Sequence, residues 1–126
     1  MVKDVLIADD DESVLEVLEL YCTELGVFRH IIRANNGSEA ASKLENQAFA
    51  LILMDINMPK RKGIDIIKEF SRYRLNSLHQ LVVVSGEIDK KIIQATTAAG
   101  VKNFLVKPFD EDKFRARVLP ILKISD

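Results

Sequence analysis

Five short aliphatic runs constrain the fold of this chain more than any other feature of its sequence. They span residues 5–8, 31–34, 51–54, 81–84 and 104–106, and most contain no polar residue at alternate positions. Strands that are buried on both faces of a parallel sheet have this uninterrupted apolar character. The second run contains Arg33, so we expect this strand to be more exposed than the others.

The segments between the runs have the spacing of amphipathic helices. The first carries an apolar series at steps of three and four, formed by Val14, Val17, Leu18, Tyr21 and Leu25. Strands and helices that alternate with short links form a parallel sheet with helices on both faces. The sequence therefore predicts an α/β fold, a doubly wound sandwich of five βα units around a central five-stranded parallel sheet.

Residues that start or end helices support this division of the chain. Asn36 with Glu39 three residues later indicates a capping box at the start of the second helix, and Asp110 can cap the last helix. Pro120 removes a helical hydrogen bond and should bend or end that last helix. In the fourth and fifth helices, the spacing predicts that four residues are mostly buried: Ile92, Ile93, Phe114 and Val118.

Size and composition limit the classes of protein to consider. The chain has 126 residues, 48% of them hydrophobic, which fits one globular domain over residues 1–126. A formal net charge of −1 favours neither nucleic acid nor an anionic membrane as a partner. The first apolar run is too short for a signal peptide, and the single cysteine, Cys22, suits a reducing compartment. We therefore expect a cytoplasmic protein with no membrane partner.

Reactive side chains follow four of the five predicted strands. In chain order they are Asp9, Asp10 and Asp11 after the first strand, Asp55 after the third, Ser85 and Gly86 after the fourth, and Lys107 after the fifth. In doubly wound folds, ligands bind beyond the carboxyl ends of the strands, where the strand order reverses. We therefore expect these side chains to meet at one edge of the molecule.

The chemistry of this group fits phosphoryl transfer to a carboxylate. Converging carboxylates repel one another unless a cation lies between them, and ligation by oxygen alone favours Mg²⁺ or Mn²⁺. Lys107 can pair with Asp55 or hold a phosphate oxygen. Ser85 supplies a hydroxyl donor, and Gly86 leaves its backbone amide approachable. Asp55 is then the nucleophile, and catalysis comes from positioning rather than from acid–base chemistry.

Four motifs resemble the receiver domain of two-component response regulators, stand-alone chemotaxis regulators included: VLIADDDESVLEVL, LILMDINMP, VVVSGE and NFLVKPF. They occur in that family's order and spacing and cover nearly the whole chain. The resemblance implies the flavodoxin-like strand order 2-1-3-4-5. It also implies that Asp55 is the phosphoacceptor, that Asp9 and Asp10 hold Mg²⁺ with Asp55 and the backbone carbonyl of Asn57, and that Ser85 and Lys107 bind phosphate.

The resemblance also assigns residues that tune the switch. Phe104, three residues before Lys107, matches an aromatic position whose orientation follows phosphorylation. Asn57 and Glu87 resemble positions beside the attacking water, and because both are polar we expect a labile phosphoryl group. Such a regulator is not an enzyme, although it assists its own phosphorylation and dephosphorylation. Pro108 restricts Lys107 to extended backbone, and the family often has a cis bond at this step.

The expected partners follow from the same resemblance. A histidine kinase or a histidine phosphotransferase donates the phosphoryl group, and an unknown protein target binds the face of the fourth and fifth helices. We expect no direct DNA binding, and either a monomer or a phosphorylation-dependent dimer.

Other interpretations of these residues remain open at this stage. The chain could be a pseudo-receiver that only binds partners, or a magnesium-dependent phosphatase of the haloacid dehalogenase type. Asp11 could simply cap the first helix. His30 and His79 precede strands at the opposite edge and are expected on the surface. Residues 60–62 form a basic run that is either a solvated turn or a surface for an acidic partner.

Overall fold

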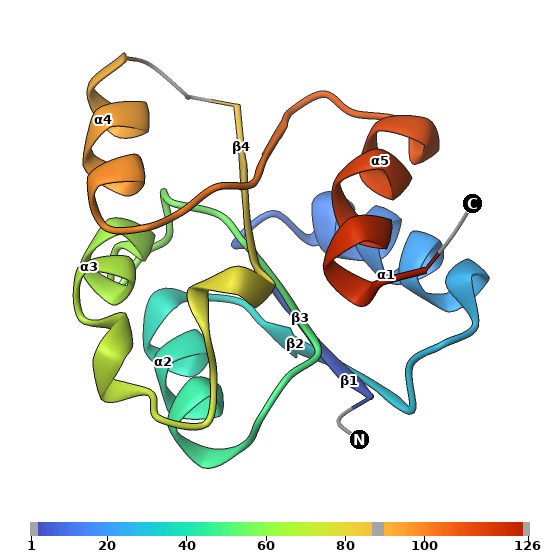
Figure 1. Cartoon of the computed structure of the whole chain (residues 1–126), viewed down its shortest axis with the longest axis horizontal. Coiled ribbons are helices and arrows are strands. Elements are labelled where there is room, and N and C mark those ends of the chain that lie inside the picture. Colours follow the sequence, from blue (N-terminus) through green and yellow to red (C-terminus); the bar gives the residue numbers. More distant parts are fainter. Residues whose placement is uncertain (1–2, 87–89, 125–126) are drawn as a thin grey trace.

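The computed structural model describes residues 3–86 and 90–124. The strands are β1 (Asp4–Ala8), β2 (His30–Ala34), β3 (Leu51–Met54), β4 (Leu81–Ser85) and β5 (Phe104–Val106), shown in Figure 1. The helices are α1 (Glu12–Leu25), α2 (Gly37–Asn46), α3 (Gly63–Lys68), α4 (Lys90–Ala98) and α5 (Glu111–Leu122). Two short 3-10 turns, η1 (Phe70–Arg72) and η2 (Leu78–Gln80), lie between α3 and β4. The predicted strands are confirmed to within one residue at each end.

The strands form one parallel sheet in the order β2-β1-β3-β4-β5, which confirms the predicted architecture. The order reverses between β1 and β3, because the chain passes from β1 to β2 on one side and returns to β3 on the other. Ala8 lies opposite both Ala34 and Met54, and Ser85 lies opposite Val106. This register aligns the carboxyl ends of the strands at one rim of the sheet.

Two separate cores explain why the strand runs do not alternate. Helices α1 and α5 cover one face of the sheet, and α2, α3 and α4 cover the other (Figure 1). Val5 and Ile7 pack into the first core, while Leu6 and Ala8 pack into the second. Successive side chains of a strand point to opposite faces, so a sheet that is covered on both sides needs apolar residues at every position.

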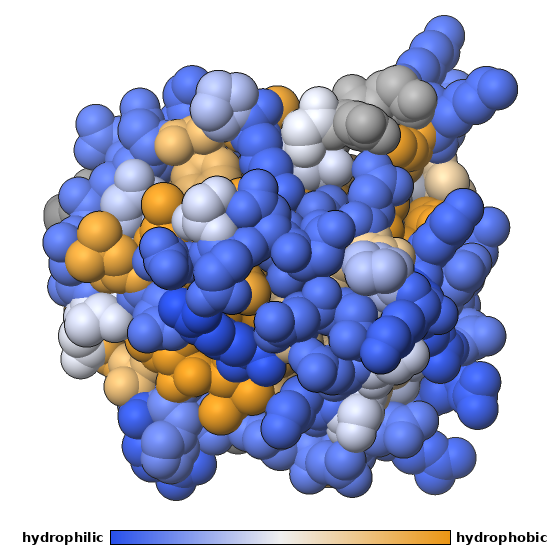
Figure 2. Space-filling view, turned by 180° about the vertical axis from the view of Figure 1, so that it is seen from behind, coloured by the Kyte–Doolittle hydropathy of each residue, from blue (hydrophilic) through white to orange (hydrophobic). Residues whose placement is uncertain are grey.

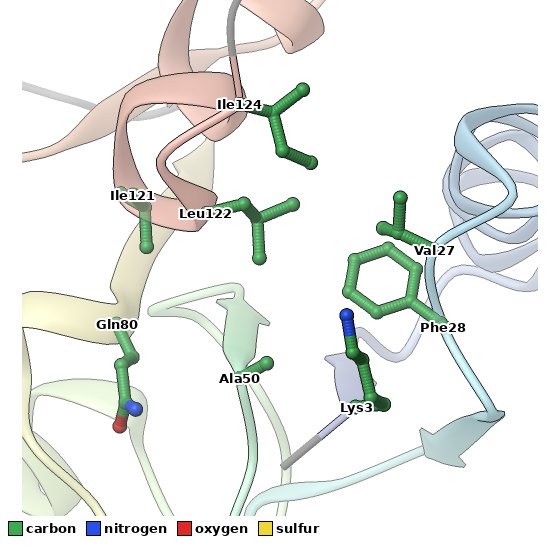
Figure 3. A pocket seen from close by; sticks show the side chains of 8 residues that line it. All are labelled: Lys3, Val27, Phe28, Ala50, Gln80, Ile121, Leu122 and Ile124. Carbon is green, nitrogen blue, oxygen red and sulfur yellow. The ribbon is translucent and has the colours of Figure 1, made fainter. Parts of the chain in front are cut away.

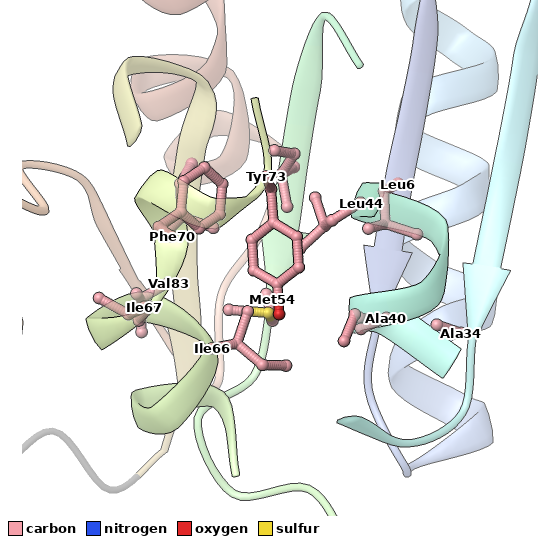
Figure 4. Close-up of a cluster of buried hydrophobic side chains, with 14 of the residues drawn as sticks. Leu6, Ala34, Ala40, Leu44, Met54, Ile66, Ile67, Phe70, Tyr73 and Val83 are labelled. Atoms are coloured by element: carbon pink, nitrogen blue, oxygen red, sulfur yellow. The ribbon is translucent and has the colours of Figure 1, made fainter. Parts of the chain in front are cut away.

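The second core contains the aromatic side chains that follow α3. In Figure 4 the ring of Tyr73 lies among Leu44, Met54 and Ile66. The rings of Phe70 and Tyr73 meet edge to face, with their centroids 5.7 Å apart. This geometry is favourable for two aromatic rings and helps to fix the segment between α3 and β4.

The predicted apolar face of α1 is correct except at Val17. Leu15, Leu18 and Cys22 are buried, and Val14, Tyr21 and Leu25 pack at the edge of the same core. Val17 is 37% exposed, because two helical steps place it about 200° around the axis from Leu15. Burial also raises the pKa of the Cys22 thiol to about 12, as expected of an inert, buried cysteine.

The prediction for Ile93 in α4 is also wrong, since this residue is 43% exposed. Helix α4 contacts the rest of the protein through the partly buried Ile92 and through Thr96, whose buried hydroxyl donates to the Ile92 carbonyl oxygen at 2.7 Å. Phe114 and Val118 of α5 are buried, as predicted.

The helix ends follow the predicted capping residues with one change. Asn36 accepts a hydrogen bond from the Glu39 backbone amide at 2.9 Å, but Glu39 in turn accepts from Asn35 instead of Asn36. Asp110 caps α5 by accepting from the Lys113 backbone amide at 2.8 Å. Pro120 lies inside α5, which ends two residues later at Leu122.

The surface opposite to the view of Figure 1 is mostly hydrophilic, with apolar patches between polar side chains (Figure 2). Arg33 of the edge strand β2 is partly exposed, as predicted, and pairs with Glu19 at 2.7 Å and with Glu12 of α1. Within residues 3–86 and 90–124, no helix is long and apolar enough to cross a membrane.

A buried carboxylate, Asp4, lies at the amino ends of the strands. Arg29 donates to it at 3.3 and 3.2 Å, Gln47 donates at 3.1 Å, and His30 Nδ1 lies 3.3 Å away. The Arg29 hydrogen bonds are the largest cause that lowers the pKa of Asp4, while burial acts in the opposite direction. This cluster fastens β1 to the start of β2 and to the end of α2.

The stability contributed by Asp4 should depend on pH. Because folding lowers the pKa of Asp4, its stabilisation is complete above the ordinary value of 3.8 and is lost as the pH falls through the lower folded-state value. We expect Asp4→Asn to reduce the free energy of unfolding by about 1–2 kcal/mol at pH 7. The reduction should be smaller at pH 3, as measured by urea denaturation. The exposed Glu16→Gln is the control, and an equal loss at both pH values would contradict the role of the Asp4 charge.

Candidate functional site

Backbone hydrogen bonds carry the sheet one residue beyond several strands and fix the predicted site residues at its rim. The Asp9 amide donates to the Ala34 carbonyl oxygen at 3.1 Å, and the Asp55 amide donates to the Ala8 carbonyl oxygen at 2.9 Å. The Lys107 amide donates to the Ser85 carbonyl oxygen at 3.0 Å. The backbones of Asp9, Asp55 and Lys107, which are far apart in the sequence, are therefore held at the carboxyl ends of the strands.

Three carboxylates converge at this rim, as the sequence predicts. Asp9, Asp10 and Asp55 each offer an oxygen, and these oxygens lie within 4.8 Å of one another. Asp9 is 1% exposed and Asp55 is 5% exposed, whereas Asp10 is exposed to solvent. The cluster thus has a buried floor and one open side.

Lys107 joins the two buried carboxylates. Its Nζ lies 2.7 Å from Asp9 Oδ2 and 3.0 Å from Asp55 Oδ2. Burial favours the neutral form of Lys107, but the hydrogen bonds to both carboxylates outweigh this effect and raise its pKa. The ammonium therefore stays charged and neutralises part of the negative charge of the cluster.

Burial also acts on Asp9. It is the largest cause that raises the pKa of Asp9, and the nearby charge of Asp55 acts in the same direction. The hydrogen bond from Lys107 opposes this shift without cancelling it. The site consequently holds more negative charge in a buried position than one lysine can stabilise, which is an environment that attracts a cation.

Backbone amides orient both buried carboxylates. Asp9 Oδ1 accepts from the Asp11 amide at 2.9 Å, and Asp55 Oδ1 accepts from the Asn57 amide at 3.1 Å. In each carboxylate, one oxygen thus accepts a hydrogen bond from a backbone amide and the other accepts one from Lys107. Asp11 itself caps α1 by accepting from the Ser13 amide at 2.9 Å, so its helix-capping role is the correct interpretation.

The remaining predicted residues lie around this cluster. Ser85 is buried at the end of β4, and Phe104 is half-buried at the start of β5, against the core beneath α2, α3 and α4. Asn57 is exposed beside Asp55, and Glu87 lies outside the described residues. The Lys107–Pro108 peptide bond is cis.

Within the described structure, there is room for a side-chain carbon at position 86, so sterics do not require Gly86. A Cβ at this position would lie 3.7 Å from Lys107 Cβ, an ordinary contact.

His30 and His79 are exposed, away from the acidic cluster, as expected. In the basic run, Arg61 pairs with Glu69 of the segment after α3.

Two glycines that the sequence did not single out support the loop after β3. A Cβ on Gly37 would clash with the Arg61 carbonyl oxygen, and a Cβ on Gly63 would lie 2.5 Å from the Asp55 carbonyl oxygen. The Gly37 amide also donates to the Pro59 carbonyl oxygen at 3.1 Å. The first turns of α2 and α3 therefore pack against the loop that begins at Asp55. In the sequence, Gly37 and Gly63 are the residues that could have indicated this packing.

The donor set fits a hard divalent cation. All three candidate ligands are carboxylates, and neither histidine nor cysteine belongs to the cluster. Mg²⁺ prefers oxygen ligands of this kind and keeps several of its waters, which leaves positions for a further oxygen ligand.

The sequence matches the family model described as the response regulator receiver domain over residues 5–119. The chain belongs to this family. Receiver domains are switches of two-component signalling. The chemotaxis protein CheY of Thermotoga maritima is 34% identical over 113 residues, which are 90% of this chain and 92% of that protein.

Other relatives of this receiver are longer. The alkaline phosphatase synthesis transcriptional regulatory protein PhoP of Bacillus subtilis is 31% identical over 100% of this chain, but the chain spans only 51% of that protein. Among solved structures, the CheX-CheY-BeF3-Mg complex from Borrelia burgdorferi contains a chain with a TM-score of 0.82 and 27% identity, over 94% of this chain and 87% of that one. Sequence and fold thus agree on the family.

The close approach at Gly37 predicts an unequal response to two similar substitutions. Gly37→Ala should lower the free energy of unfolding by about 1–3 kcal/mol, because the new methyl group must displace the Arg61 backbone. The control Gly86→Ala, in the open part of the rim, should change it by less than about 0.5 kcal/mol. Urea denaturation of the two variants measures both values. Equal effects would contradict the assignment of Gly37 as a support of the loop.

Proposed function

We propose that this receiver domain is a phosphorylation switch in which Asp55 accepts a phosphoryl group in the presence of Mg²⁺. The contact of a nearly buried Asp55 with Lys107, inside a cluster of three carboxylates, carries this proposal. Asp9, Asp10, Asp55 and the backbone carbonyl of Asn57 would hold the ion, as the resemblance to the family implies. The ion would offset negative charge on the phosphoryl oxygens.

In the proposed transfer, an oxygen of Asp55 forms a bond to phosphorus as the bond from phosphorus to a donor histidine nitrogen breaks. The electron pair of that bond stays on the histidine nitrogen, which then takes up a proton. Lys107 already donates to Asp9 and, at 3.0 Å, to Asp55 Oδ2, so its one remaining N–H donor is placed to bind a phosphoryl oxygen. The Asn57 amide holds the other oxygen of Asp55 and limits rotation of the carboxylate.

The proposed signal leaves the site through β4 and β5. Ser85 ends β4 beside Lys107, and Phe104 lies opposite Val83 of β4. We propose that the Ser85 hydroxyl binds the phosphoryl group and that Phe104 moves further inward, which changes the surface of α4, β5 and α5. Ile93 and Val106 are 43% and 52% exposed in this region and could contact the target.

A histidine kinase or a histidine phosphotransferase is the proposed donor, and binding of a protein target, rather than of DNA, is the proposed output. We further propose that residues 1–126 act as one cytoplasmic receiver unit. Asn57 is exposed beside Asp55, where a polar side chain can orient an attacking water, so the phosphoryl group should be short-lived. The intact contacts of Lys107 with Asp9 and Asp55 argue against a pseudo-receiver.

A small phosphodonor tests the proposal without a known kinase. Incubation with phosphoramidate and MgCl₂ should add one phosphoryl group to the wild-type chain, as measured by intact mass. Asp55→Asn should add none, because an amide nitrogen cannot replace the nucleophilic oxygen. The exposed Asp65→Asn is the matched control and should be modified like the wild type.

Two results, one from that experiment and one from a separate phosphatase assay, would count against the proposal. Modification of Asp55→Asn would place the phosphoacceptor elsewhere. Steady release of phosphate from p-nitrophenyl phosphate would favour a phosphatase instead of a switch.

The metal site predicts a separate effect on stability. At a Mg²⁺ concentration of about 100 times the dissociation constant, the free energy of unfolding should rise by about 2.7 kcal/mol. Asp9→Asn should remove most of this increase, whereas Asp11→Asn should keep it, because asparagine caps a helix as well as aspartate does. Thermal unfolding with and without MgCl₂ measures the difference. An increase that survives in Asp9→Asn would contradict the assignment of Asp9.

A further inference from the structure

A second concave site lies at the amino ends of the strands, at the opposite rim of the sheet from Asp55. It is a cavity of about 440 Å³. Figure 3 shows that its lining side chains come from the end of α5, from the loop that joins α1 to β2 and from residues near the starts of β1, β3 and β4. Its apolar walls include Val27, Phe28, Leu122 and Ile124. The volume falls within the range of about 300–1,000 Å³ that small-molecule sites occupy.

In the described part of the chain, one charged side chain lines this cavity. The ammonium of Lys3 points into the space between Phe28 and Leu122 (Figure 3). No ion pair between residues of the described chain involves Lys3, whereas the neighbouring Arg29 and His30 both lie against Asp4. The cavity therefore presents a cation beside an apolar wall.

Two other polar side chains near the cavity make hydrogen bonds within the protein. Gln80 lines it, but the Gln80 side-chain oxygen accepts from the Ser77 amide at 3.0 Å. Asp4 follows Lys3 directly, but its side chain contacts Gln47, the residue after α2, on the other face of the sheet. Among the residues that the structure describes, no carboxylate lines the cavity.

From this combination we infer that the cavity binds a small amphipathic carboxylate. The aliphatic part of such a ligand would cover Phe28, Leu122 and Ile124, and its carboxylate would pair with Lys3. A cationic ligand would be repelled by Lys3, and a fully polar anion would leave the apolar wall exposed to water. This inference does not depend on the proposed phosphorylation, because the two sites lie at opposite ends of the strands.

Octanoate and octan-1-ol are suitable probes, since they share an aliphatic chain and differ in charge. Each is titrated into the isotope-labelled full chain while backbone amide shifts are recorded by NMR. Octanoate should shift the amides of Val27, Phe28 and Ile124. Lys3→Met should weaken octanoate binding about threefold, the effect expected for an exposed ion pair, and should leave octan-1-ol binding unchanged.

Three further variants complete the test. The exposed Lys43→Met on α2 should bind octanoate like the wild type. Asp55→Asn should do so too, whether or not Asp55 is the phosphoacceptor, because the cavity lies at the other end of the strands. Ala50→Leu adds methyl groups beside the cavity and should weaken both probes, with its folding read from the same spectra.

Three results would overturn the inference. The first is that octanoate changes amide shifts over the whole surface, without a maximum at the cavity. The second is equal loss of octanoate binding in Lys3→Met and Lys43→Met. The third is a change in the same amide shifts on dilution without a probe, which would show that a second copy of the chain covers the cavity.

Discussion

Two buried carboxylates share one ammonium at the rim of the sheet, and the geometry of the whole site depends on this contact. Asp9 follows β1, Asp55 follows β3 and Lys107 follows β5, so the contact joins three strands at their carboxyl ends. Removing Lys107 would leave both buried carboxylates without compensation, which is strongly destabilising. Because one lysine faces two carboxylates, the cluster is stable and yet retains a deficit of positive charge. The proposed binding of a cation at the exposed side of the cluster depends on that deficit.

The sequence predicts the fold well because strands covered on both faces leave a simple pattern. The apolar runs locate all five strands, and the order of polar residues after them locates the rim. Helical periodicity is less exact, since it identifies a broad apolar stripe and not its orientation on the sheet. Val17 and Ile93 were misplaced for this reason: each lies next in sequence to a residue that packs inward. Asp11 could be separated from Asp9 and Asp10 only through its hydrogen bonds to Ser13.

Features that depend on distances between remote segments could not be predicted from the sequence. In the sequence Asp4 is a charged residue that precedes an apolar run, and its burial becomes clear only when Arg29 and Gln47 are brought to it. Gly37 looks like an ordinary residue of a helix start until the Arg61 backbone is placed against it. Gly86 is the opposite case. Its position beside Ser85 suggested a need for glycine, but its described neighbours leave room for a Cβ.

The contact of Gly37 with Arg61 has a mechanical consequence. The loop after β3 is in close contact with the first turn of α2 on one side, and close-packed backbone has almost no compressibility. A group added to Asp55 therefore cannot be accommodated by moving this loop toward α2. If Asp55 is the phosphoacceptor, as we propose, the added group would have to be accommodated on the other side, toward the ends of β4 and β5. The packing around one glycine thus closes one direction of movement to the loop after β3.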